Sequence, residues 1–147
     1  MLQIRPVHTL QAVTDYHAAD ELLERIRALD PRFHERAYLF VLAALEYCQQ
    51  RRPERGHITG QELARGCREF ALDQFGLMAR SVLSHWGILK TEDIGRIVFL
   101  LIEAGLLMKQ ESDRMEDFDA VFDFVEAFEG NYLWRGVPGV IHAERRI

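Results

Sequence analysis

Carboxylates crowd one short stretch of this 147-residue chain and are the first side chains to consider for chemistry. Residues 111–129 contain eight acids and a single arginine. Hard cations take oxygen ligands, which Asp113, Glu116, Asp117, Asp119 and Asp123 could supply. Their spacing does not match a calcium loop, because no glycine provides the sharp turn that such a loop needs. We therefore expect no metal site, and interpret these acids as helix caps and a solvated negative surface.

Cysteine and histidine side chains are the second group that could take part in a chemical reaction. Cys48, Cys67, His57 and His85 could support nucleophilic catalysis. Both cysteines fall on or near apolar faces of expected helices, where a free cysteine is most often an inert small hydrophobe. Glu54 and His57 have E-x-x-H spacing but lie in a linker with Pro and Gly, so they need not converge on a metal. We expect no catalytic residue, no cofactor and no enzymatic activity.

Five amphipathic helices must position these side chains, as capping residues, apolar spacing and Gly or Pro stops predict. Their expected ranges are 15–29, 34–52, 59–75, 77–86 and 91–104. The second carries an apolar stripe too wide for a surface helix, which predicts the most buried position. Thr59 and Glu62 form a capping box at the start of the third, and Thr91 is expected to cap the fifth. Gly66, inside the third helix, costs about 1 kcal/mol relative to alanine, so we expect another segment to pack closely against it.

Two short strands are expected after the fifth helix, at 106–109 and 119–124, joined by a polar turn. For 118–128 a helix stays open as well, because its apolar residues also fit a helical stripe. The element order predicts a mostly α (α+β) fold. It is a winged helix-turn-helix-like core over 57–128 with a β-hairpin wing, preceded by two additional N-terminal helices in 15–52. An arm (1–14) and a C-terminal tail (130–147) complete a single expected domain.

Several sequence words within this core carry a resemblance. They are H-I-T-G-Q-E-L (57–63), Q-F-G-L-M-A-R-S-V-L (74–83), W-G-I (86–88), T-E-D-I-G-R-I-V-F (91–99) and the closing F-D-F with Phe128, together with A-Y-x-F-V-x-x-A-L-E-Y (37–47). Together they resemble a family of small uncharacterised proteins from planctomycete and verrucomicrobial bacteria, over roughly residues 30 to 128. The family has no known activity, so the resemblance implies an independent small protein and supplies no catalytic residue.

The charges argue against the function that a helix-turn-helix first suggests. Such a fold would present Thr91, Glu92, Asp93 and Arg96 to DNA bases, and the two carboxylates would repel the phosphate backbone. The net charge of -5 adds no attraction. A nucleic-acid-binding regulator remains the alternative, and would need an arginine cluster to gather on one face. Its members are Arg51, Arg52, Arg55, Arg65 and Arg68.

We therefore expect a non-catalytic protein–protein interaction module, an adaptor, with an acidic surface that could steer a basic protein partner. A homodimer through the first helix or the tail stays open. No apolar segment approaches the roughly 20 residues that span a bilayer, and two unspaced cysteines suit a reducing compartment, so we expect a cytoplasmic protein. The candidate interaction residues are Asp113, Glu116, Asp117, Asp119, Thr91, Glu92, Asp93, Arg96, Tyr132 and Trp134.

Overall fold

The computed structural model describes residues 3–4 and 16–130, and within them the chain is mostly helical. The helices are α1 (Tyr16–Arg27), α2 (Glu35–Gln50), α3 (Gly60–Phe75), α4 (Ala79–His85) and α5 (Thr91–Glu103). Three short helical turns, η3 (Gly76–Met78), η4 (Met115–Phe118) and η5 (Glu126–Gly130), and two strands, β1 (Gln3–Ile4) and β2 (Leu107–Met108), complete the elements. The prediction of a mostly α fold is confirmed, and the five helices fall inside the five expected ranges.

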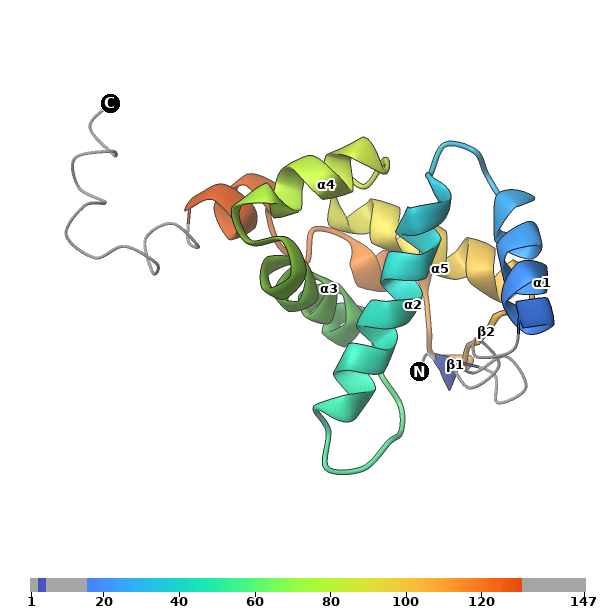
Figure 1. The fold of residues 1–147 in the computed structure, drawn as a ribbon. Helices are drawn as coiled ribbons and strands as arrows, with labels where there is room; N and C mark the ends of the chain where they lie inside the picture. The colour runs from blue at the N-terminus through green and yellow to red at the C-terminus, as the bar shows by residue number, and fades with distance from the viewer. Residues whose placement is uncertain (1–2, 5–15, 131–147) are drawn as a thin grey trace.

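Helix α2 lies at the centre of the fold, crossing in front of α5 with α3 on one side and α1 on the other (Figure 1). Half of its 16 residues are buried, including Tyr38, Val41 and Leu45. Ile97 and Val98 of α5 are fully buried in the same core. The wide apolar stripe of α2 follows from this position, because partners on three sides leave little of the helix for water.

Close approach of α2 and α3 depends on Gly66. A Cβ atom at this glycine would lie 2.1 Å from the sulfur of Cys48, far inside van der Waals contact. The sequence predicted that a neighbouring segment packs against Gly66, and that segment is the C-terminal half of α2. The capping box that starts α3 is also confirmed: the Thr59 hydroxyl accepts from the Glu62 amide (3.1 Å), and the Glu62 carboxylate accepts from the Thr59 amide (3.3 Å).

The predicted β-hairpin wing is wrong. Strand β2 pairs antiparallel with β1 near the N-terminus, with Ile4 opposite Leu107. Residues 119–124, the expected returning strand, contain no strand, and residues 124–130 are helical. The backbone of this segment cannot join a ladder, because the amides of Ala120 and Val121 donate to side chains of α5 and Ala120 has a positive φ of 44°.

Phe118 fixes the path of the segment that follows β2. Its ring is almost fully buried, in a slot between the start of α3 and the first half of α5. A Cβ at Gly95 would lie 2.8 Å from three atoms of Phe118, and a Cβ at Gly60 would lie 3.0 Å from its ring. The two glycines therefore form the slot, and the segment packs flat on the helices instead of projecting as a wing.

Candidate interaction site

Three of the acids in 111–129 hold the turns of their own segment. Asp113 is buried, and its carboxylate accepts from the Gln110 amide at 2.8 Å. Asp117 accepts from the Arg114 amide at 3.0 Å, and Asp123 accepts from the Glu126 amide at 2.9 Å. These bonds match the expected capping role of the acids. Glu116 and Asp119 are more exposed to solvent, as are Glu111, Glu126 and Glu129.

The start of α5 is covered, so it presents little to a partner. Thr91 is fully buried; its hydroxyl donates to the Phe118 carbonyl (2.6 Å) and accepts from the Val121 amide (3.2 Å). The expectation that Thr91 caps α5 is wrong, because Lys90 is the N-cap residue and the Thr91 hydroxyl is taken by the 118–121 segment. The Glu92 carboxylate accepts from the Ala120 amide at 3.4 Å.

At the start of α5, the Asp93 carboxylate accepts hydrogen bonds from the backbone amides of the two residues before the helix. It is 2% exposed, accepts from the amides of Leu89 (2.9 Å) and Lys90 (3.2 Å), and pairs with Arg32. Of the four candidate residues on α5, Arg96 alone is exposed. The helix that a DNA reader would insert into a groove is therefore occupied by contacts within the chain. Tyr132 and Trp134 lie outside the described residues.

The arginine cluster at the α2–α3 connection is largely engaged with groups of this chain. Arg55 makes a bidentate ion pair with Glu46, with N–O distances of 2.7 and 2.9 Å. These hydrogen bonds lower the pKa of the Glu46 carboxyl and raise the pKa of the Arg55 guanidinium. Arg52 pairs with Glu62 at 3.3 Å.

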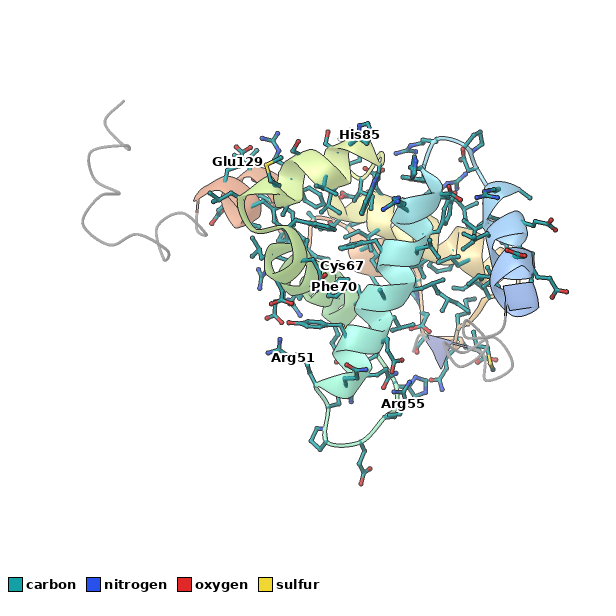
Figure 2. All side chains as sticks on the ribbon, in the orientation of Figure 1. Arg51, Arg55, Cys67, Phe70, His85 and Glu129 are labelled. Carbon is teal, nitrogen blue, oxygen red and sulfur yellow. The ribbon has the colours of Figure 1, made fainter. Side chains whose placement is uncertain are left out.

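Arg51 lies 3.6 Å from the Glu69 carboxylate, with its guanidinium over the Tyr47 ring, and Arg68 lies over Phe122. Figure 2 shows Arg51 and Arg55 at the lower end of α2. Arg65 is exposed on α3. Three of the five arginines, Arg51, Arg52 and Arg55, thus have a carboxylate neighbour already, which reduces the positive field that a phosphate backbone would meet.

The two thiols are poorly suited to nucleophilic chemistry. Burial raises the pKa of Cys67 well above its ordinary value. Burial, with the charges of Glu69 and Glu62, raises the pKa of Cys48 to about 11. Both sulfurs are therefore protonated at neutral pH, whereas the thiolate is the nucleophile. His85 is exposed on α4, well away from Cys67 in Figure 2.

An aromatic row along the seam between α2 and α3 is the surface feature that sequence reasoning missed. Ring centroids lie 5.2 Å apart for Tyr47 and Phe70 and 5.5 Å for Phe40 and Phe70. Farther along, Phe40 and Phe75 lie 6.2 Å apart, and Phe75 meets Trp86 edge-on at 5.6 Å. Phe40 is buried, but the other four rings are only half-buried. Figure 2 shows Phe70 beside α2, in the middle of this seam.

The row opens into a groove of about 530 Å³, which we call the aromatic groove. Its walls come from α1, α2, the end of α3 and the residue after α4. The residues that line it are Leu23, Arg27, Glu35, Arg36, Leu39, Phe40, Ala43, Phe70, Gln74, Phe75 and Trp86. The sequence signal was the excess width of the stripe on the second helix, where Phe40, Ala44 and Tyr47 form a second apolar face; we interpreted it as burial alone.

Charged side chains of the aromatic groove stand at its edge. Arg27 pairs with Glu35 at 2.8 Å. Arg36 is exposed, and no acidic side chain within the described ranges lies in ion-pair distance of it. Two guanidinium groups against one carboxylate leave the edge with one excess positive charge, although the chain as a whole carries -5.

Two further classes of site find no support in residues 3–4 and 16–130. No three His, Cys, Asp or Glu side chains there are grouped so that they could hold a metal ion. None of the helices there has the length and apolar character needed to cross a membrane. Comparison with known proteins gives no match to a family model, to a curated protein or to a solved structure.

Proposed function

We propose that this protein is a non-catalytic protein–protein interaction module and that the aromatic groove is its binding face. The half-buried rings of Phe70, Phe75 and Trp86 around an open groove carry the proposal. A concave surface lined mainly by apolar and aromatic side chains, with a few polar groups, is typical of a binding site. Aromatic residues are also enriched at the centres of protein interfaces.

The helices α3, α4 and α5 support a helix-turn-helix-like scaffold for this module. In the proposal α5 is the internal support of the scaffold rather than a reader of DNA, since Thr91 and Asp93 are buried. Glu116 and Asp119 keep a secondary role, because their exposed charges could steer a basic partner during approach. Membership of the planctomycete and verrucomicrobial family is likewise proposed; the words that carry the resemblance include Phe40 and Tyr47 of the aromatic row.

Binding of nucleic acid is the competing proposal, and the contacts within the chain disfavour it. Non-specific affinity for DNA comes from Lys and Arg that neutralise phosphates and release counterions. Here Arg52 and Arg55 would first have to leave Glu62 and Glu46. Tight binding to duplex DNA that weakens steeply with salt would favour the regulator over the adaptor.

The experiment uses one groove variant and one matched control on the same helix. Ala43→Glu places a carboxylate on the groove lining without removing an aromatic ring, while Gln50→Glu adds the same charge at an exposed site outside the groove. Tagged wild-type and variant proteins are used to capture partners in the source organism. Each captured partner is then purified and titrated against all three proteins.

We expect a partner whose affinity falls at least roughly tenfold with Ala43→Glu, because binding would bury the new charge. Gln50→Glu should leave the affinity unchanged. A partner that binds Ala43→Glu normally and is lost with Glu116→Lys would contradict the groove and restore the acidic surface as the binding face.

A further inference from the structure

We propose that the aromatic groove binds one amphipathic α-helix of a partner protein, and that this helix carries a carboxylate beside its apolar stripe. The proposal rests on the proposed function and specifies the occupant of the same site. Three properties of the groove support it: its apolar surface, the lack of backbone partners for an extended chain, and the charge at its edge.

The apolar surface of the groove calls for large apolar anchors. Phe40 forms part of it at 5% exposure, with Leu39 and Ala43 beside it on α2. The half-buried rings of Phe70 and Trp86 flank these residues from α3 and from the end of α4. A volume of about 530 Å³ accommodates several side chains rather than one. Several anchors on one face are what residues at i, i+3, i+4 and i+7 of a helix present.

Backbone hydrogen bonding favours a helix over an extended peptide. The walls of the groove are helices, whose N–H and C=O groups are mostly bonded within each helix, and no strand edge in the described part of the chain lines it. Its polar side-chain atoms belong to Arg27, Glu35, Arg36 and Gln74, together with the indole N–H of Trp86. An extended chain lying on this surface would lose water from its backbone without gaining partners, which is costly. A helix satisfies its own backbone before it binds.

Charge selects the kind of helix. Arg27 is paired with Glu35, so Arg36 provides the excess positive charge at the edge. A carboxylate on the occupant, next to its apolar stripe, would meet this guanidinium. The exposed acids of residues 111–129 would repel an acidic helix from that part of the surface. Electrostatic complementarity of this kind fixes orientation and partner choice more than raw affinity.

The test is a selection from a display library, with the full chain as target. The library holds three sets of peptides: amphipathic helices with Glu or Asp beside the apolar stripe, the same helices with Lys or Arg, and extended proline-rich peptides. Binders are measured individually against wild type, Ala43→Glu, Arg36→Glu and the Gln50→Glu control. Arg36 is exposed, so its substitution tests the charge even if Ala43→Glu fails to fold.

We expect acidic helices to dominate the selection. Arg36→Glu should lower the affinity of these acidic helices roughly 3- to 10-fold, with a smaller change at high salt. It should raise the affinity of the helices that carry Lys or Arg. Gln50→Glu should change neither set.

Basic helices or proline-rich peptides that win the selection, and are lost with Ala43→Glu, would overturn the inference while leaving the groove as the binding face. Self-association abolished by Ala43→Glu would assign a second copy as the occupant and overturn it too. Binders that ignore both groove substitutions would refute the inference and the proposed function together.

Discussion

Replacement of Gly66 by alanine is the sharpest test of how α2 and α3 pack. In an isolated helix this change would stabilise by about 1 kcal/mol, because glycine is a poor helix former. In the folded protein the added Cβ would lie 2.1 Å from the Cys48 sulfur and 3.8 Å from the Cys48 Cβ, and meets no other atom within 4 Å. The sign of the effect therefore depends on a single sulfur atom.

The magnitude follows from these two contributions. Overpacking a well-packed core costs about 1 to 3 kcal/mol, and the gain in helix propensity offsets about 1 kcal/mol of that. We expect Gly66→Ala to lower the free energy of unfolding by about 1 kcal/mol. In a Cys48→Ala background the sulfur is gone and only the ordinary 3.8 Å contact remains. The same substitution should then stabilise by about 1 kcal/mol, which gives a coupling of about 2 kcal/mol.

Urea unfolding of the four proteins of this double-mutant cycle, followed by circular dichroism under reducing conditions, measures both signs. Gly56→Ala is the matched control, because a Cβ at Gly56 would meet nothing within 4 Å. This control should be neutral or slightly stabilising in both backgrounds.

Gly66→Ala that stabilises the wild-type protein would refute the reasoning. It would mean that Cys48 can turn its sulfur away at no cost, and that the close approach of the helices does not depend on the glycine. Additivity within about 0.5 kcal/mol across the cycle would lead to the same conclusion.

Three further outcomes are expected. Gly95→Ala should lower the melting temperature by roughly 4 to 8 °C, since the new Cβ would lie 2.8 Å from Phe118 atoms; an unchanged temperature would contradict the slot. Tyr38 should ionise near pH 12 in an absorbance titration, because burial and the charge of Asp30 raise its pKa to about 12, and Tyr38→Phe should abolish that step. Stability gained from keeping this phenol neutral is complete below pH 10 and is lost as the pH rises toward 12. The raised pKa values of Cys48 and Cys67 predict slow alkylation of the native protein at pH 7.5. Fast alkylation would show that a thiolate is populated at this pH and would contradict the raised pKa values.

The sequence was sufficient to predict where the helices lie. Local signals fix helix boundaries, and the capping box of Thr59 and Glu62 is the clearest case. The close neighbour of Gly66 was also predictable, because a glycine inside a helix is costly unless something needs the space. These features depend on residues a few positions apart, and interactions over such distances are visible in the order of the chain.

The predictions of a wing and of a cap at Thr91 were wrong because they depend on residues far apart in the sequence. Alternating apolar residues over 119–124 fit a strand, but Thr91 and Glu92, almost thirty positions earlier, take the amides of that segment. Strand β2 found its partner more than a hundred positions away, at Gln3 and Ile4. Periodicity describes one segment at a time, so it cannot reveal which distant segment competes for a backbone group.

What the sequence by itself determined is the set of helices, the capping box that starts α3, and the general role of the acids in holding turns. Only the tertiary structure decided which surfaces remain for a partner. It buried the start of α5, paired Arg52 and Arg55 with acids, and left the rings of Phe70 and Trp86 half-buried around a groove. The physical reason is that the solvent exposure of a side chain depends on how the helices pack. Whether an apolar ring lies in the core or on a binding surface is decided by which helices cover it.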